Sequence, residues 1–348
     1  MERESLSFRQ LMVLLWAGML GPAAEMLPGP AGKAGAAGLT GLLAAGLALA
    51  LAGNLLWRVA APAEGLAAGL RSSLGGWALY LYMIWGEVLL SVRLRLSAQR
   101  LAGAGSRDGT VWFFLLVLAL FAAWMGRGGL GALGRTAEMM FGALVLTAGA
   151  VLVLALFQTR GLNLLGRPWE AGRGAAAFQA LGVVSCGLFA AFLIQPRNME
   201  RPGKSWLRWT AGGCAALALG ELIILGSFGP ELTARLEVPF LQLAKSVGVE
   251  GAFQRAESVA AALWSFSDLL LLAEILWGMR QIGLELGTKL SPQKIAGAAV
   301  LPAAVCALAL LDWERGRAVM KLLPLGGAAL GIALPLAALG ARGWKGRK

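Results

Sequence analysis

The sequence predicts an all-α integral membrane protein with about ten transmembrane helices. Of its 348 residues, 58% are hydrophobic and only 14% are charged, whereas average soluble domains carry about 25% charged residues. Apolar stretches of about 18 to 23 residues, long enough to cross the hydrocarbon core of a bilayer, recur from one end of the chain to the other. Such a chain cannot cover itself with polar surface in water, so we expect a bilayer to be its solvent.

The apolar stretches predict one transmembrane domain over residues 1–348, with two repeats of five helices at about 8–157 and 175–341. The helices are expected at 8–27, 36–57, 76–96, 110–126, 138–157, 175–195, 206–227, 258–280, 293–311 and 319–341. The first stretch follows Arg3 and Arg9 as a signal peptide would. Because Glu2 and Glu4 dilute that charge and apolar helices follow throughout, we interpret it as a retained helix.

Basic residues indicate the orientation of the chain. Ten spans put both termini on one side of the membrane, and clusters of Lys and Arg favour the cytoplasmic side. One cluster follows the sixth helix, and the other ends the chain: Arg197, Arg201, Lys204, Arg208, Arg342, Lys345, Arg347 and Lys348. The N-terminus and the C-terminus are therefore predicted to be cytoplasmic.

The longest connection, residues 229–257, mixes charged and apolar side chains. We expect it to contain an amphipathic helix on the outer face; the alternative is a solvated loop.

Two of the predicted helices contain residues that interrupt helices. The first carries Gly21-Pro22 in mid-span, and the sixth carries Gly182 and Ser185-Cys186-Gly187 near its centre. Proline removes a backbone donor, and glycine tolerates unwinding. Interruptions at matching positions of two repeats indicate a transporter-type binding site, because unwound backbone at membrane depth survives only where it lines a cavity. The alternative is that these small residues only permit close helix packing.

Five carboxylates lie inside predicted spans: Glu25, Glu87, Glu221, Asp268 and Glu274. A carboxylate at the bilayer centre costs about 2.5–3.5 kcal/mol, so each needs a partner, a proton or a polar cavity. Asp268 and Glu274 are six residues apart and do not share a helix face. Asp268 shares its face with Trp264, Ser265 and Leu272, which could line a cavity together with Trp85. For each acid the alternative is an interhelical ion pair or hydrogen bond.

Composition argues against several other functions. The chain has no histidine, which is the commonest general base and a frequent metal ligand. Cys186, Cys214 and Cys306 lie in apolar runs without metal-binding spacing. The net charge of +12 is scattered between apolar runs, which suits anionic lipid headgroups and not nucleic acid. No cofactor, no metal and no enzymatic activity are expected.

Several segments together resemble a known family. The stretches GRGGLGALGRTAEMMF (126–141) and GLNLLGRPWEAG (161–172) are similar to those that flank the fifth helix of spore germination receptor B-subunits. These endospore germination permeases belong to the amino acid–polyamine–organocation superfamily. The start of the chain (7–29) and the segment 229–264 are similar to the family's first helix and to its outer loop and eighth helix. The resemblance covers about residues 7–280.

The resemblance implies a LeuT-like fold with inverted five-helix repeats and broken helices 1 and 6. It implies a subunit that senses a nutrient germinant, typically an amino acid, midway across the inner spore membrane, with A- and C-type subunits as partners. Carried over by position, the ligand would be bound by Gly21, Pro22, Ala23, Glu25, Trp85, Ser185, Cys186, Gly187, Leu188, Trp264, Ser267 and Asp268.

The sixth helix departs from the family pattern. Relatives often read F-P-F-G-E across the break, whereas this chain reads Val184-Ser185-Cys186-Gly187-Leu188 and lacks the proline and the acid. The missing acid implies a different ligand or sensing without ion coupling. The alternative function is an ion-coupled amino-acid transporter of the same fold, which the intramembrane acids favour.

Overall fold

The computed structural model describes residues 6–26, 39–105, 110–163, 173–196, 199, 203–236, 238–247, 256–309 and 312–345. All the regular elements in these ranges are helices. In chain order they are α1 (Phe8–Met26), α3 (Leu39–Ala60), α4 (Leu66–Leu74), α5 (Gly76–Gly105), α6 (Val111–Arg127), α7 (Leu130–Leu156), η2 (Gly161–Asn163), α8 (Arg173–Gly187), η3 (Phe189–Leu193), α9 (Gly203–Thr233), α10 (Pro239–Ser246), α11 (Ala256–Glu285), α12 (Pro292–Ala309), α13 (Trp313–Met320), α14 (Leu323–Ala328), η4 (Ala329–Ala333) and α15 (Leu334–Lys345).

Each stretch predicted to span the membrane overlaps a helix or a run of short helices. Seven helices in the described ranges are long and apolar enough to cross a membrane, and 111–127 and 181–193 are shorter apolar helices. The largest differences in bounds are that α5 continues to Gly105 and that α7 begins at Leu130. An all-α membrane protein is therefore confirmed.

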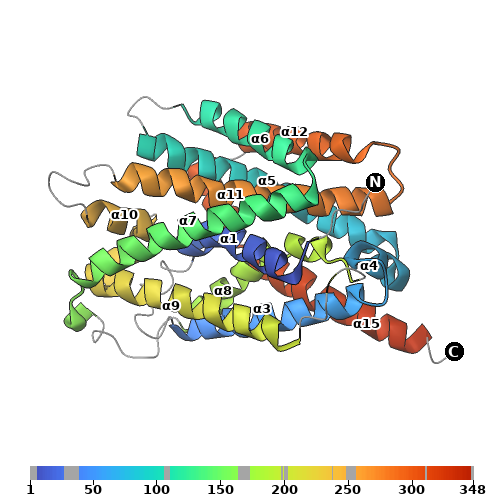
Figure 1. Ribbon diagram of the computed structural model, residues 1–348, viewed down its shortest axis with the longest axis horizontal. Helices are drawn as coiled ribbons and strands as arrows, with labels where there is room; N and C mark the ends of the chain where they lie inside the picture. Colours follow the sequence, from blue (N-terminus) through green and yellow to red (C-terminus); the bar gives the residue numbers. More distant parts are fainter. Residues whose placement is uncertain are drawn as a thin grey trace.

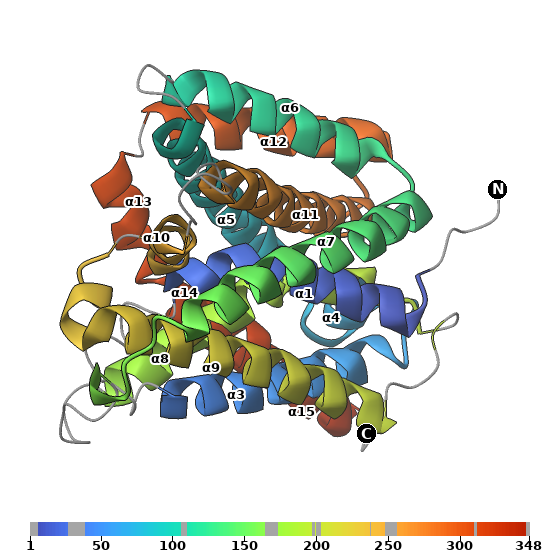
Figure 2. The ribbon, with the colours of Figure 1, turned by 60° about the vertical axis from the view of Figure 1, so that its left-hand side comes forward.

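The helices form two groups with α1 and α7 between them. Figure 1 shows α6 and α12 side by side with α5 and α11 beneath them, and α3, α8, α9 and α15 on the opposite side of α1. Figure 2, turned by 60°, shows the same grouping. α1 is in contact with α11 of the first group and with α8 and α9 of the second. The helix α1 thus contacts both groups, which also meet directly where η3 packs against α11.

The predicted break in the first helix takes a milder form than an unwound turn. α1 is helical from Phe8 to Met26, with Pro22 inside it. Residues 27–38, which include the Pro28-Gly29-Pro30 stop, lie outside the described part of the chain. Within α1, the effect of Gly21-Pro22 is confined to its hydrogen bonds, which are described with the site below.

The break in the sixth span is a change of helix type. α8 ends at Gly187, Leu188 is a turn residue, and the narrower 3₁₀ helix η3 follows over Phe189–Leu193. A Cβ atom on Gly187 would lie 2.8 Å from Leu15 Cδ1 and 3.0 Å from Met19 Sδ. A side chain at Gly187 would therefore force Leu15 or Met19 to shift, and glycine favours the close approach of α8 to α1.

The last span is also irregular, because α14 and α15 are joined by the π-helix η4. Single π-helical turns interrupt the regular backbone hydrogen bonds and frequently mark functional positions. The hydroxyl of Tyr82 on α5 donates to the Leu330 carbonyl of η4 at 2.5 Å. This bond ties the last span to α5.

The connection after α9 contains the short helix α10. A kink at Gly229 (φ 76°, ψ 163°) separates the end of α9 from its main part. Phe240 of α10 stacks on Trp264 of α11, with ring centroids 4.4 Å apart, in a second apolar cluster beside the main core. The apolar side of α10 thus packs onto α11, and residues 248–255 lie outside the described ranges.

Candidate functional site

Two arginines and two carboxylates from three helices form a cyclic network in the interior. Arg93 lies 2.6 Å from Glu25 and 2.5 Å from Asp268, joining α5 to α1 and to α11. Arg100 lies 2.6 Å from Glu25 and also bonds to Asp268. Each arginine therefore contacts both acids, and the formal charges cancel.

Helical spacing explains why the network forms. Arg93 and Arg100 are seven residues apart, about two turns, so both side chains lie on one face of α5. Glu25 is in the last turn of α1, and Asp268 lies near the middle of α11. The side chains of Arg93 and Asp268 are fully buried, and those of Arg100 and Glu25 are only 2% and 9% exposed.

The energetics of the network point to function more than to stability. Removing charges from water costs several kcal/mol per ion, which a well-formed buried pair only about offsets. Well-packed apolar side chains of similar volume would hold the three helices together as well or better. The network instead provides a site with both positive and negative groups, where a charged ligand could replace one of the protein groups.

Ser267 of α11 is inserted into the hydrogen bonds of α1 beside this network. Its hydroxyl accepts from the Gly21 amide at 2.9 Å and donates to the Ala17 carbonyl at 2.5 Å. In an uninterrupted α-helix these two backbone groups bond to each other. Pro22 in addition has no amide hydrogen for the Gly18 carbonyl. The Gly21-Pro22 pair therefore opens the hydrogen bonding of α1 without ending the helix, and α11 fills the opening.

The structure brings some of the other predicted residues close to the network. Pro22 and buried Ala23 are part of the same segment of α1. The thiol of Cys186 is fully buried and within electrostatic range of Arg93, Glu25 and Asp268. The hydroxyl of Ser185 instead donates to the Leu323 carbonyl of the last span at 2.8 Å.

Two of the predicted residues lie away from the network. The ring of Trp85 covers Gly326 of α14, where a Cβ atom would be 2.0 Å from it. Trp264 stacks on Phe240 in the second apolar cluster. Trp264 is one helical turn before Asp268, but its large ring is held by α10. These aromatic side chains therefore contribute to packing outside the ionic network.

Sequence reasoning missed the two arginines. The apolar pattern predicts that the third helix ends at residue 96, before Arg100, and it singles out acids but not arginines inside the spans. The signal was present: two arginines seven residues apart in an apolar helix share a face, and two acids lie elsewhere inside the spans. The interhelical ion pair, considered as the alternative reading of each acid, is the state of Glu25 and Asp268.

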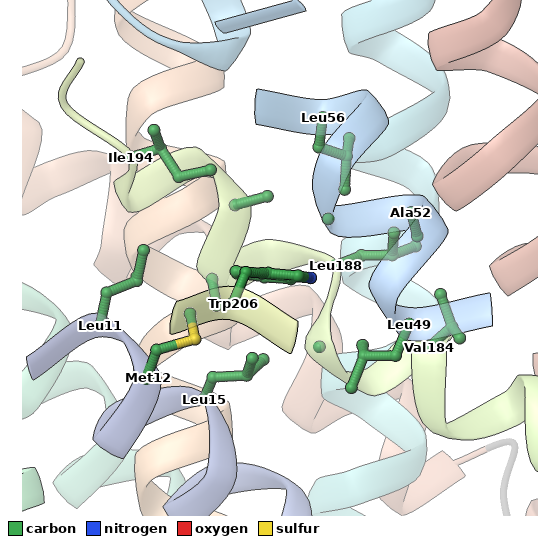
Figure 3. A pocket seen from close by; sticks show the side chains of 14 residues that line it. Leu11, Met12, Leu15, Leu49, Ala52, Leu56, Val184, Leu188, Ile194 and Trp206 are labelled. Carbon is green, nitrogen blue, oxygen red and sulfur yellow. The ribbon is translucent and has the colours of Figure 1, made fainter. Parts of the chain in front are cut away.

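On its other side α1 borders a small apolar cavity at the break in the sixth span (Figure 3). The cavity has a volume of about 20 Å³. Leu11, Met12 and Leu15 reach it from α1, and it is otherwise lined by α3, α8, η3 and α9: Leu49, Ala52, Gly53, Leu56, Val184, Gly187, Leu188, Ala190, Ala191, Ile194 and Trp206. The space would admit one water molecule, but its apolar lining offers that water few hydrogen-bond partners. Gly187 and Leu188 thus lie where the broken sixth span packs against α1 and α3 through apolar side chains, a contact that we call the apolar joint.

The described ranges contain no group of three Cys, Asp or Glu side chains that could hold a metal ion. The described cysteines Cys186, Cys214 and Cys306 are free thiols.

Comparison with solved structures identifies the fold. The chain is similar to Mhp1, a nucleobase-cation-symport-1 family transporter in a closed conformation with bromovinylhydantoin bound, with a TM-score of 0.60 and 14% identity over 94% of this chain and 77% of that one. It is also similar to a Na⁺-coupled sialic acid symporter in a substrate-bound, outward-open state, with a TM-score of 0.61 and 12% identity over 92% and 76% of the two chains. The chain therefore has the LeuT-like fold expected from its sequence.

No protein-family model matches the chain, and no curated protein matches it in sequence.

Proposed function

We propose that this LeuT-like membrane protein is an ion-coupled transporter of a small zwitterionic molecule, with an amino acid as the expected substrate class. The observation that carries the proposal is the buried ring of Arg93, Arg100, Glu25 and Asp268 between α1, α5 and α11. The fold shared with a nucleobase-cation-symport-1 family transporter and with a Na⁺-coupled sialic acid symporter supports transport over an enzymatic role.

The chemistry of the ring matches a zwitterion. A substrate carboxylate would take the place of a protein carboxylate on the guanidinium groups, and arginine is well suited to bind carboxylate with two parallel hydrogen bonds. The substrate ammonium would pair with the displaced Glu25 or Asp268. Each protein charge would then keep a partner, so binding would leave no buried charge exposed to an apolar surrounding.

The location supports the same proposal. Ligand sites of repeat-built transporters lie near the bilayer midplane at interrupted helices. Here Gly21, whose amide is bonded to Ser267, is one turn before Glu25 on α1. Movement of α1 relative to α11 would break the Ser267 bonds and the ion pairs together. Substrate exchange would therefore accompany separation of the two groups of helices.

Reconstituted vesicles test the proposal. The purified protein is placed in liposomes, and uptake of a labelled mixture of amino acids is measured under Na⁺ and proton gradients. We expect gradient-dependent uptake that an amino acid inhibits, and that its amine-only and acid-only analogues inhibit at least tenfold less well. Uptake that is equally sensitive to an apolar analogue would contradict a charge-recognising site. The exposed Arg58 provides a control, because Arg58→Gln leaves the ring untouched.

A germinant-sensing subunit of a spore germination receptor is the second candidate. It is favoured by the ordered resemblance of segments 7–29, 126–141, 161–172 and 229–264 to that family. A subunit of this kind would bind the same class of ligand in the inner spore membrane with A- and C-type partners, and exchange of ion pairs alone would be its switch. Binding without uptake in the vesicle experiment would favour it, as would loss of nutrient-triggered germination in a deletion strain.

A further inference from the structure

A second acid on α11 has the opposite environment to Asp268. The side chain of Glu274 is fully buried, and in the part of the chain that the structure describes neither of its carboxylate oxygens has a hydrogen-bond partner. Asp268, six residues earlier on the same helix, contacts two arginines. The two acids are close enough to share one functional region but do not share partners.

The carboxyl group of Glu274 packs closely against α1. The Oε1 atom of Glu274 would lie 2.6 Å from a Cβ atom placed on Gly18 of α1. One turn further along α11, a Cβ atom on Gly278 would lie 2.6 Å from the Phe189 ring of η3. The carboxyl group thus occupies a space that only glycine on α1 leaves open.

None of the charged or titratable groups in the described ranges donates a hydrogen bond to Glu274. Arg93 of α5 is bonded to Glu25 of α1 and to Asp268. The Cys186 thiol of α8 is within electrostatic range of Glu274 but carries no positive charge. Arg280, on α11 itself, has its guanidinium 4.0 Å from the centre of the Trp277 ring.

Glu138 of α7 lies at the start of α1, where it contacts Arg9 and Gln10. Arg93 and Arg280 therefore have partners other than Glu274.

Physical chemistry then decides the charge state of Glu274. An ionised carboxylate without partners in an apolar interior is far more costly than the neutral acid, so burial of this kind favours the protonated form. Asp268 differs because two guanidinium groups, those of Arg93 and Arg100, contact its carboxylate. One helix thus presents an acid paired with two arginines and, six residues later, a buried acid with no hydrogen-bond partner among the described residues.

We propose that Glu274 is a proton-binding site whose proton is held while α1 is packed against α11 and is released when the two separate. The step is a simple ionisation, in which the carboxylic acid gives a carboxylate and the proton passes to water. No electrons are transferred. Contact at Gly18 makes the state of Glu274 depend on the position of α1, which also carries Gly21 and Glu25.

The same geometry would link the proton to the substrate. This link rests on the proposed transport function, and it makes the proton the coupling ion. Because α1 contributes to both the ionic ring and the contact with Glu274, one movement of α1 would open both. The acid missing from helix 6 relative to the germination receptor family is then no obstacle to coupling, since α11 supplies one.

Infrared spectroscopy of the reconstituted protein tests proton binding without a substrate. The wild-type protein at neutral pH is expected to show an absorption of a protonated carboxyl group that Glu274→Gln lacks and that Glu138→Gln retains. Loss of a carboxylate absorption instead would show an ionised Glu274 and overturn the proposal. Because glutamine has the shape of the neutral acid, Glu274→Gln is expected to fold, and a variant that fails to fold would also contradict a neutral Glu274.

Vesicles under a pH gradient, with the labelled amino-acid mixture outside and unlabelled amino acids inside, test coupling. One proton per substrate lets a gradient of one pH unit support about a tenfold accumulation of a neutral solute. We expect such accumulation for the wild type and for Glu138→Gln, and for Glu274→Gln only exchange of labelled for unlabelled solute, with no accumulation. Equal accumulation by Glu274→Gln would overturn the coupling role. Absence of uptake by every protein would count against the transport function, and the infrared result would still decide whether Glu274 binds a proton.

Discussion

The two sides of α1 differ in chemistry. Toward α5 and α11 it offers Glu25, the opened hydrogen bonds at Gly21-Pro22 and the contact with Glu274. Toward α3 and α8 it offers Leu11, Met12 and Leu15, which border a small apolar cavity (Figure 3). The ionic side has strong, directional contacts that exist in one arrangement, whereas the apolar side has non-directional contacts that tolerate small shifts.

This difference indicates how α1 could move. Separation on the ionic side requires partners for two arginines and two acids, so it depends on a ligand, a proton or water. Sliding on the apolar side requires only that side chains repack. The ionic side would therefore decide when α1 moves, and the apolar side would permit the movement.

The largest effect is expected from breaking the ionic ring at one point. Arg93→Gln leaves Asp268 and Glu25 with only Arg100, and removal of one partner of a buried pair costs about 3–5 kcal/mol. We expect a large drop in thermal stability in detergent and loss of uptake. A double variant, Arg93→Met with Asp268→Leu, keeps the Arg100–Glu25 contact and equal charges, so it should lose much less stability. Equal losses in the single and double variants would contradict a coupled ring.

A smaller effect is expected at the apolar joint. Gly187→Ala places a methyl group 2.8 Å from Leu15 and 3.0 Å from Met19, and overpacking of this kind costs about 1–3 kcal/mol. Gly142→Ala on α7 is the matched control, because a Cβ atom there has nothing within 4 Å. Gly187→Ala should therefore unfold at a clearly lower temperature than the control Gly142→Ala. Equal stability would show that α8 does not need its close approach to α1.

Removing the hydroxyl that joins α11 to α1 should have a milder effect. Ser267→Ala deletes the bonds to Gly21 and Ala17, and we expect a loss of about 1 kcal/mol, because the two backbone groups can then bond to each other. The Gly21 amide should exchange its hydrogen at a changed rate, measured by hydrogen–deuterium exchange. Ser91→Ala, which removes only a bond within α5, should leave that rate unchanged. An unchanged Gly21 rate in Ser267→Ala would argue against insertion into the helix.

The smallest effect is expected from filling the cavity. Val184→Ile adds a single methyl group at the lining, and we expect a gain in stability of about 0.5–1 kcal/mol, with slower uptake because the apolar contact is stiffer. Melting temperature and initial uptake rate measure the two effects. A lower melting temperature would mean that the cavity has no room for the added methyl group.

Much of the fold could be predicted from the sequence, because span length and apolar composition determine which segments enter the bilayer. The interruption of the sixth span could also be predicted from the sequence, because Gly187 lies where the α-helix changes to a 3₁₀ helix. Gly21-Pro22 has a smaller effect than expected, since Ser267 supplies the missing hydrogen bonds from a segment about 250 residues away. Spacing along one helix does not reveal such partners.

The site could be predicted only in part for a similar reason. Glu25 and Asp268 were recognisable as acids inside apolar spans, but their pairing with Arg93 and Arg100 depends on which helix faces meet. Trp264 shares a helix face with Asp268, yet α10 holds its ring in another cluster. Packing between distant segments therefore decides which of the candidate residues form the site.

The central claim is that the ionic ring binds the substrate, and one comparison tests it most directly. Uptake of labelled amino acids is measured in vesicles that contain equal amounts of folded wild-type protein and of the charge-balanced double variant with Arg93→Met and Asp268→Leu. We predict gradient-dependent uptake by the wild type and at least a hundredfold lower uptake by the variant. Uptake by the folded variant at the wild-type rate would contradict the claim and would place the substrate elsewhere in the fold.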